Sequence, residues 1–325
     1  MGKKRIKHLG KKKRRKKNIY VKSKIRGVGI TILLVISIIS IFNISKYIEE
    51  LYVGKDIESN KVEYYIEVAD EASEYKVQLN WKELMAIDMV RYDDLTAVKK
   101  KDTLKIGDMF ISKEQNNDGI VTYKVKSFNE VLDKIDFNKD EKNDAKKNVK
   151  LLESAYLDSS ITSDNSKISF INSIKKVAVE SYKKYGILPS ITVGQAILES
   201  GWGQSELSLK SNNMFGIKAD NRWNGKSIEV VTSENYNDKI VASFRSYDSI
   251  GDSIKDHAMF LVENKRYKEH GLFEATHYIT QAQSLEDAGY STKTNESGEK
   301  IYADTLINVI RSYNLQLIDH EVQVK

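Results

Sequence analysis

The segment "ILPSITVGQAILESGWGQSELSLKSNNMFGIKA", residues 187–219, contains the strongest structural signals in the chain. It holds the only proline, Pro189, which breaks a preceding helix and suits the start of a new one. Ser190 is a residue type that caps helix N-termini, and Gly201 is typical of a helix C-terminus. The apolar positions between them recur at helical spacing, at Val193, Ala196 and Ile197. The pattern predicts a helix that begins at Ser190 and ends before Gly201.

Glu199 falls in the last turn of this predicted helix. The negative end of the helix dipole favours the protonated carboxyl group, and we expect the adjacent Trp202 to exclude water; both effects raise a carboxyl pKa. A general acid at neutral pH needs such a raised pKa, as in glycosidases with a glutamic acid in an apolar pocket. The small residues Ser200, Gly201 and Gly203 leave space beside the acid. A solvated surface glutamate is the alternative interpretation.

The flanking sequence predicts further helices and one β-hairpin. The stretch "ISFINSIKKVAVESYKKYG", residues 168–186, repeats apolar residues every three or four positions and ends on a glycine. In "RWNGKSIEVVTSENYNDKIVASFRSY", residues 222–247, an Asn-Gly turn precedes an alternating strand, a polar turn and a second strand. Ser249 and Asp252 form a capping box for the next helix, and an amphipathic helix begins at Tyr302. The predicted fold class is mainly α with a small β-hairpin lobe.

The N-terminus has a different composition from the remainder of the chain. Residues 1–26 carry fourteen Lys or Arg and no acidic residue, whereas residues 27–325 carry 38 basic and 46 acidic residues. Such a basic run either binds nucleic acid or flanks a membrane segment. Because the uncharged stretch "GVGITILLVISIISIFNIS" follows at residues 27–45, we interpret the run as a membrane flank and predict no nucleic-acid partner.

Residues 27–45 are long enough to cross the hydrocarbon core of a bilayer. A buried soluble helix and a cleaved signal peptide are the alternatives, but no Ala-x-Ala-like site follows the apolar run. We predict an uncleaved anchor in the cell membrane that spans it once. Because positive flanks stay inside, residues 1–26 form a cytoplasmic tail and residues 47–325 lie outside.

Composition divides the predicted extracytoplasmic part into three. Residues 47–155 form an accessory or spacer region that we expect to be mostly helical, with loops or helix starts at "KEQNNDG" and "NKDEKNDAKKN". Residues 156–167 are rich in small polar residues and form the predicted linker, and residues 168–325 form the predicted catalytic domain. Five scattered histidines and no cysteine give no metal-ligand spacing, so we predict no metal and no cofactor.

Five sequence segments of the predicted catalytic domain resemble motifs of a known family and occur in the same order along the chain. They are "AILESGWGQS", "NNMFGIKA", "TSEN", "FRSYDSIGDSIKDHAMFL" and "YADTLINVIRSYNL". Together they resemble glycoside hydrolase family 73, bacterial endo-β-N-acetylglucosaminidases found among autolysins and flagellar peptidoglycan hydrolases, over residues 168–316. The resemblance implies a lysozyme-like, mainly helical fold with a hairpin lobe. It also implies hydrolysis of the β-1,4 bond between N-acetylglucosamine and N-acetylmuramic acid in peptidoglycan glycan strands.

The resemblance assigns roles to particular residues. The family's general acid matches Glu199, and its second carboxylate, carried on the hairpin, best matches Glu234. Glu229 is the competitor; because the two have opposite parity in a strand, only one of them can face the cleft. Tyr290 matches a tyrosine that lines the cleft, although the following "KTNESGEK" replaces a shorter turn. We predict substrate contacts at Trp202, Asn213, Phe215 and Trp223.

Five aromatic residues are assigned packing roles instead of catalytic or sugar-binding ones, namely Phe244, Tyr247, His257, Phe260 and Tyr302. Two classes of function remain open. The first is a membrane-anchored peptidoglycan hydrolase, with a muramidase as a variant of that activity. The second is a noncatalytic cell-wall-binding or scaffold module with a lysozyme-like fold. The presence of both Glu199 and a carboxylate in the hairpin favours the enzyme, because a desolvated acid is costly to keep.

Overall fold

A computed structural model describes residues 57–234 and 238–324 of the chain. The predicted basic tail, residues 1–26, and the predicted membrane span, residues 27–45, lie outside the described residues. Across the described ranges, no helix combines the length and the apolar character that crossing a bilayer requires. Residues 57–325 form one compact unit, which contains two hydrophobic clusters.

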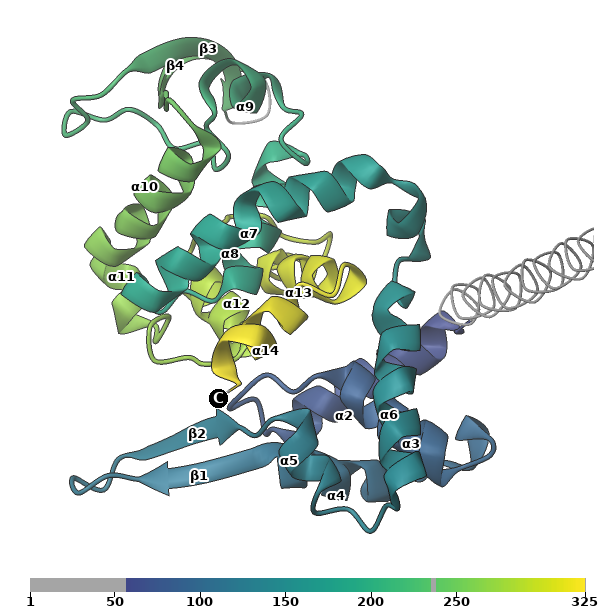
Figure 1. Cartoon of the computed structure of the whole chain (residues 1–325). Helices are drawn as coiled ribbons and strands as arrows, with labels where there is room; N and C mark the ends of the chain where they lie inside the picture. Colours follow the sequence, from purple (N-terminus) through teal and green to yellow (C-terminus); the bar gives the residue numbers. More distant parts are fainter. Residues whose placement is uncertain (1–56, 235–237, 325) are drawn as a thin grey trace, which may run out of the picture. The chain divides into compact units, whose positions relative to one another are not determined.

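The first cluster is built by the region predicted as accessory (Figure 1). Its elements are α2 (Ser59–Ala72), α3 (Trp81–Arg91), η1 (Leu95–Ala97), α4 (Lys100–Phe110), β1 (Ile111–Gln115), β2 (Val121–Val125), α5 (Phe128–Leu132), α6 (Lys139–Leu151) and η2 (Leu152–Ser154). The region is mostly helical, as predicted, but it also contains the antiparallel hairpin β1–β2, which the sequence analysis missed. Asn138 starts α6 with a capping box, so "NKDEKNDAKKN" is a helix start.

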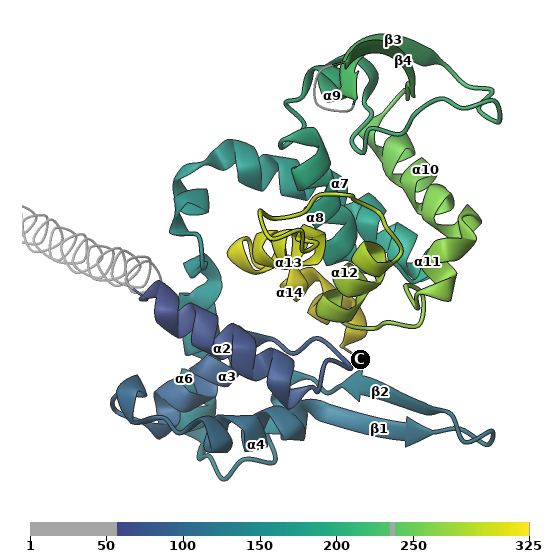
Figure 2. The ribbon, with the colours of Figure 1, turned by 180° about the vertical axis from the view of Figure 1, so that it is seen from behind.

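The second cluster is built by the C-terminal helices. Its elements are α7 (Asn165–Tyr185), α8 (Pro189–Ser200), α9 (Glu206–Ser211), β3 (Ser227–Glu234), β4 (Asp238–Arg245), α10 (Ile250–Glu263), α11 (Lys265–Glu269), α12 (Tyr278–Asp287), α13 (Tyr302–Ser312) and α14 (Gln316–Gln323). Helix α8 contacts α7, α12, α13 and α14 (Figures 1 and 2). It is buried on nearly every side and forms the centre of the fold.

The boundaries of α8 differ slightly from the prediction. Pro189 is the first residue of the helix, and Gly201 ends it with a left-handed φ of 56°. Ser190 was predicted to cap the helix, but this prediction is wrong. The backbone N–H and the hydroxyl of Ser190 both donate to the carboxyl group of Asp319 in α14. Ser190 therefore fastens α8 to the C-terminal helix.

The predicted hairpin near residue 230 is confirmed. Strands β3 and β4 pair antiparallel in a register from Ser227 opposite Arg245 to Glu234 opposite Asp238. The tip of the hairpin, residues 235–237, lies outside the described residues. Ser249 caps α10, and its side chain accepts from the backbone N–H of Asp252, which confirms one half of the predicted capping box. The Asp252 carboxylate accepts from the Ser249 hydroxyl instead of the Ser249 backbone N–H, so the reciprocal half differs from the prediction.

Polar contacts connect the two clusters. The indole N–H of Trp81 donates to Asn314 Oδ1 at 3.1 Å, and the Asn314 amide donates to the carbonyl of Ala155 at 2.8 Å. Val125 of β2 forms a parallel bridge with Val324. The segment predicted as a linker contains the short helix η3 (Ser159–Ser163), and its Ile161 is buried.

Candidate active site

Glu199 lies in the last turn of α8, where the sequence analysis placed it. It lines a pocket of about 420 Å³ between the helical body and the base of the β3–β4 hairpin. The pocket is lined by Glu199, Phe215, Gly216, Ile217, Lys218, Asp220, Arg245, His257, Phe260, Arg266, Tyr267, Tyr290, Ser291, Lys293 and Tyr302. Five of these residues are Phe or Tyr, namely Phe215, Phe260, Tyr267, Tyr290 and Tyr302, and their rings suit contact with the apolar faces of sugar rings.

The Glu199 carboxyl group is held by a chain of hydrogen bonds. The Tyr302 hydroxyl donates to Glu199 Oε1 at 3.1 Å, and the Gln195 amide donates to the Tyr302 oxygen at 3.0 Å. Burial keeps the Tyr302 hydroxyl protonated, because it raises the tyrosine pKa well above its ordinary value. The Glu199 carboxyl group therefore has a fixed orientation at the edge of the pocket.

The environment of Glu199 raises its pKa above the ordinary value of 4.5. The main cause is desolvation, which penalises the charged form, while the Tyr302 hydrogen bond and the Lys293 charge act in the opposite direction. Much of the residue's surface opens to solvent, but the surrounding protein atoms still limit the hydration of the carboxyl group. The position at the helix C-terminus adds to the same effect. Glu199 is thus accessible to a ligand and also disposed to keep its proton.

Tyr290 and Phe215, two of the predicted site residues, line the same pocket as Glu199. The Tyr290 hydroxyl shares a hydrogen bond of 3.2 Å with His257 Nε2, and the Tyr290 ring lies 5.1 Å from that of Tyr302. Phe215 stacks on His257 with ring centroids 3.8 Å apart. Burial lowers the His257 pKa to about 3, so this imidazole is neutral at physiological pH. Phe215, His257 and Tyr290 therefore form an uncharged aromatic layer on one part of the pocket wall.

The remaining predicted substrate contacts lie elsewhere. Trp202 lines a different pocket with Phe170 and Gln204, and its ring packs edge-on against Tyr313 at 4.8 Å. Asn213 is buried, and its amide donates to the carbonyls of Ile217 and Arg245. Asn213 therefore attaches the loop that contains Phe215 to Arg245, at the base of the hairpin.

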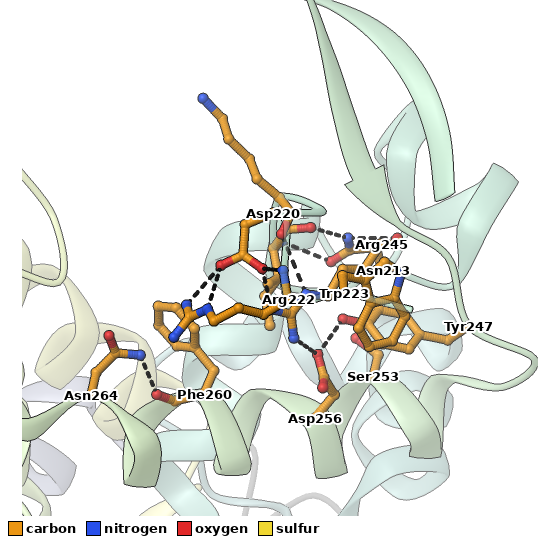
Figure 3. Close-up of polar contacts among 12 residues, drawn as sticks. Asn213, Asp220, Arg222, Trp223, Arg245, Tyr247, Ser253, Asp256, Phe260 and Asn264 are labelled. Atoms are coloured by element: carbon orange, nitrogen blue, oxygen red, sulfur yellow. Dashed lines mark hydrogen bonds and ion pairs between the residues drawn. The ribbon is translucent and has the colours of Figure 1, made fainter. Parts of the chain in front are cut away.

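Trp223 lies at the base of the hairpin, among charged residues (Figure 3). The Arg245 guanidinium lies over the Trp223 ring, 4.7 Å from the ring centroid, and the ring packs edge-on against Tyr247. Arg245 donates to Asp256 at 2.8 Å, and the Tyr247 hydroxyl donates to the same carboxylate at 2.7 Å (Figure 3). These contacts fasten β4 to α10, so the hairpin base is rigidly attached next to the pocket.

The two carboxylates considered for the second catalytic role lie on the same strand. Glu229 is opposite Ser243 and is exposed, whereas Glu234 is the last residue of β3 and lies opposite Asp238. The register gives them opposite parity, as the sequence analysis expected. Among the described side chains that line the Glu199 pocket, Glu229 is absent.

Sequence reasoning missed two groups that act on Glu199. Tyr302 was assigned to packing, yet its hydroxyl contacts the Glu199 carboxyl group. Lys293 was not considered; it lies in the segment that replaces a shorter family turn, and it reaches the pocket wall. Neither residue could be found by spacing, because both are about a hundred residues from Glu199 in the chain. In the described part of the chain, no three His, Asp or Glu side chains gather to hold a metal ion.

A glutamic acid with a raised pKa, at a helix end and in an aromatic pocket beside a β-hairpin, is the arrangement that a glycosidase requires of a general acid. Residues 175–315 match the sequence profile of the glucosaminidase family, described as mannosyl-glycoprotein endo-beta-N-acetylglucosaminidase. This domain of the chain belongs to that family, glycoside hydrolase family 73, which confirms the resemblance.

The proteins similar to this chain include two curated proteins and one solved structure. Exo-glucosaminidase LytG of Bacillus subtilis is 37% identical over 156 residues, which are 46% of this chain and 52% of the relative. Peptidoglycan hydrolase FlgJ of Vibrio parahaemolyticus is 37% identical over 147 residues, 43% of this chain and 46% of the relative. The chain thus spans about half the length of these relatives. The catalytic domain of the autolysin Auto from Listeria monocytogenes is 33% identical, with a TM-score of 0.41, over 47% of this chain and 88% of that domain.

Proposed function

We propose that the chain is a peptidoglycan hydrolase that cleaves the β-1,4 bond between N-acetylglucosamine and N-acetylmuramic acid. The observation that carries the proposal is Glu199, a carboxyl group with a raised pKa in an open, aromatic-lined pocket of a glucosaminidase-family domain. The printed names of the relatives, exo-glucosaminidase and peptidoglycan hydrolase, support the same substrate class.

In the proposed reaction Glu199 is the general acid. Its protonated carboxyl group donates the proton to the glycosidic oxygen while the bond to the anomeric carbon breaks. The carboxylate that remains is stabilised by the Tyr302 hydroxyl, which already donates to Oε1. Desolvation by the pocket disfavours this charged form, so the acid regains its proton after each turnover.

A second group must stabilise the positive charge at the anomeric carbon or activate water there. We propose Glu234 for this role, with Glu229 as the competitor, because both belong to β3 of the hairpin whose base borders the pocket. A separation of about 5 Å between the two carboxylates would predict retention of anomeric configuration, and about 6.5–9.5 Å would predict inversion. Participation by the N-acetyl group of the substrate is a third route.

We also propose that residues 27–45 anchor the chain in the cytoplasmic membrane. The nineteen uncharged residues and the fourteen cations before them support a single span with the N-terminus in the cytoplasm. Residues 47–325 then lie outside the membrane, where peptidoglycan is found. This placement would explain the basic tail without a nucleic-acid partner.

The test is end-group analysis of purified cell walls digested by the chain and by Glu199→Gln. We expect new reducing ends on N-acetylglucosamine with the wild-type chain, and at least about a hundredfold slower release with Glu199→Gln, because general acids contribute about 10²–10⁴-fold. Glu206→Gln is the matched control, since Glu206 is exposed, pairs with Lys210 and lies outside the pocket.

Each other outcome selects a different conclusion. Undiminished release by Glu199→Gln would overturn the assignment of the general acid. New reducing ends on N-acetylmuramic acid would identify a muramidase. Wall binding without release of any reducing ends by the wild-type chain would identify a noncatalytic wall-binding module.

A further inference from the structure

The pocket around Glu199 contains more positive than negative side chains. Four basic residues line it, namely Lys218, Arg245, Arg266 and Lys293, against the two carboxyl groups of Glu199 and Asp220. Asp220 forms an ion pair with Arg222, which donates to it at 2.7 Å, and Arg245 forms an ion pair with Asp256 at 2.8 Å. The pocket therefore carries positive charge that its own carboxylates do not balance.

Arg266 and Lys293 carry this excess charge. The Arg266 guanidinium donates to the Tyr267 hydroxyl at 2.7 Å and to the carbonyl of Gly289 at 3.3 Å, so it is held in place by neutral groups. The Lys293 side chain makes no hydrogen bond and no ion pair with any of the residues described. Within residues 57–234 and 238–324, neither cation has a carboxylate within salt-bridge distance.

Lys293 is a costly residue at this position. Its positive charge favours the ionised form of Glu199, so it opposes the desolvation that keeps the general acid protonated. A ligand anion that paired with Lys293 would cancel this opposition when the site is filled. A cation that favours loss of the Glu199 proton before substrate binds is therefore better explained by contact with the substrate than by support of the protonated acid.

The segment that carries Lys293 is locally ordered. The backbone N–H of Lys293 donates to Ser291 Oγ at 3.2 Å, and Thr294 bridges Lys300 antiparallel. Asn295 Oδ1 accepts from the backbone N–H of Glu299 at 2.9 Å and so closes the turn. Lys293 thus projects from a short, hydrogen-bonded turn at the pocket wall and does not belong to a long unstructured loop.

We propose that Lys293 and Arg266 form a subsite for a carboxylate on the N-acetylmuramic acid side of the substrate. This inference rests on the proposed function. The carboxylate has two possible sources, the lactyl group of glycan without peptides and the stem peptide of intact peptidoglycan. A neutral oligomer of N-acetylglucosamine carries neither group, so the subsite would make the pocket selective for peptidoglycan over chitin-like strands.

The test measures binding without turnover. The full-length chain with Glu199→Gln is titrated with three soluble probes: muramyl oligosaccharides bearing stem peptides, muramyl oligosaccharides stripped of peptides, and N-acetylglucosamine oligomers of equal length. Lys293→Gln and Arg266→Gln are then added singly to this background. Lys268→Gln is the matched control, because Lys268 is an exposed cation on α11 outside the pocket.

We expect Lys293→Gln and Arg266→Gln to weaken binding of at least one carboxylate-bearing probe by about 3- to 10-fold each, as partly exposed charge pairs do. Loss with both muramyl probes assigns the lactyl carboxylate, and loss only with the peptide-bearing probe assigns the stem peptide. Binding of the N-acetylglucosamine oligomer and of every probe to Lys268→Gln should not change. The loss should shrink at high salt because ionic screening weakens the contact.

Equal losses for all three probes, or no loss for either muramyl probe, would overturn the inference. Because the Lys293 side chain is exposed, thermal unfolding should be the same for Lys293→Gln and its parent. Arg266→Gln removes the hydrogen bonds to Tyr267 and Gly289, so its binding is measured well below its own melting temperature. The result is independent of catalysis. Selective binding without wall hydrolysis by the wild-type chain would defeat the proposed function alone, and hydrolysis without charge-selective binding would defeat this inference alone.

Discussion

Glu199 combines two properties that usually conflict, access to solvent and a raised pKa. The pocket opens on one side of the carboxyl group, while α8, Tyr302 and the neighbouring aromatic wall restrict hydration from the others. Desolvation outweighs the Tyr302 hydrogen bond and the Lys293 charge, because the net direction of the pKa shift is upward. This balance is what makes the residue suitable as an acid for a bound sugar.

The Tyr302 hydroxyl lowers the pH limit that the Glu199 pKa sets on activity in this scheme. It donates to Glu199 and therefore favours the ionised carboxylate, so Tyr302→Phe should raise the Glu199 pKa further. Because a general acid works only when protonated, the alkaline limb of the activity profile should move to higher pH in Tyr302→Phe. A limb that stays in place or moves to lower pH would mean that Tyr302 has only a packing role.

The sequence placed Glu199 in the last turn of a helix, as the structure has it, but Trp202 is not the aromatic residue beside its carboxyl group. Gly201, Trp202 and Gly203 have φ values of 56°, 62° and 74°, so three consecutive residues adopt the left-handed conformation. The indole then packs against Phe170 and Tyr313 and lies outside the Glu199 pocket. A helix end was readable from the glycines, whereas the direction of the next side chain depended on backbone angles that the sequence did not specify.

Among the elements, the packing of α8 against α13 brings Glu199 and Tyr302 together. Gly194 lies at the contact; a Cβ atom there would be 2.7 Å from Leu306 Cδ1 and 3.2 Å from Ile310 Cγ1. The two helices can approach closely because this position has no side chain. The sequence analysis identified only one apolar stripe on α8, since it could not show that four other helices surround it.

Gly194→Ala should destabilise the fold by about 1–3 kcal/mol, because overpacking forces the neighbouring side chains to shift. It should also lower activity, because displacement of α13 carries Tyr302 away from Glu199. The measurement is the free energy of unfolding by denaturant titration, together with the rate of wall lysis.

Gly251→Ala in α10 is the matched control for this prediction. Its added Cβ would make only an ordinary contact with Val177 Cγ2 at 3.5 Å, so the change should be neutral or stabilising by up to about 1 kcal/mol. Similar effects of the two substitutions on stability would contradict the proposed role of Gly194.

The two hairpins show how far strand prediction could reach. Strand β3 has alternating apolar residues and a preceding Asn-Gly pair, and it was predicted correctly. Strands β1 and β2 have the sequences "ISKEQ" and "VTYKV", and the first of these is mostly exposed and polar. Without a buried face, β1 has no period-two signal, so its pairing with β2 was not visible in the sequence.

In the whole molecule, a buried ionic network connects the accessory region to the catalytic domain. The Arg311 guanidinium of α13 donates to Asp70 of α2 at 2.8 Å, and the Tyr278 hydroxyl donates to the same carboxylate at 2.6 Å. His277 Nε2 lies 3.3 Å from the other carboxylate oxygen. Asp70 is almost fully buried, so removal of its partners leaves its negative charge unpaired. Removal of Asp70 likewise leaves the positive charge of Arg311 unpaired. The sequence could not indicate this network, because 241 residues separate Asp70 from Arg311.

Residues 160–325 alone should therefore be less stable than residues 57–325. The truncated chain lacks Asp70, the partner of Arg311, and Trp81, the partner of Asn314. It also lacks β2, so the C-terminal segment at Val324 becomes exposed. Asp70→Asn in the longer chain should reproduce part of the loss, about 3–5 kcal/mol for breaking a buried ion pair. The measurement is calorimetry of residues 57–325, residues 160–325 and the Asp70→Asn variant. Equal melting temperatures would show that the accessory region does not stabilise the catalytic domain.

Because helix α13 carries both Tyr302 and Arg311, the network also bears on catalysis. Arg311 lies near the C-terminal end of α13, and Tyr302, which donates to Glu199, lies at its N-terminal end. Loss of the Asp70 contact therefore releases the end of α13 opposite to Tyr302. The accessory region is accordingly more than a spacer in this structure, since it supports the helix that positions the active-site tyrosine.

The decisive measurement is a carbon-13 NMR titration of the Glu199 carboxyl group, assigned with Glu199→Gln and repeated in Tyr302→Phe. We predict a midpoint above 4.5 in the wild-type chain that coincides with the alkaline limb of wall hydrolysis, and a still higher midpoint in Tyr302→Phe. A wild-type midpoint at or below 4.5 would contradict a proton held on Glu199 by its pocket.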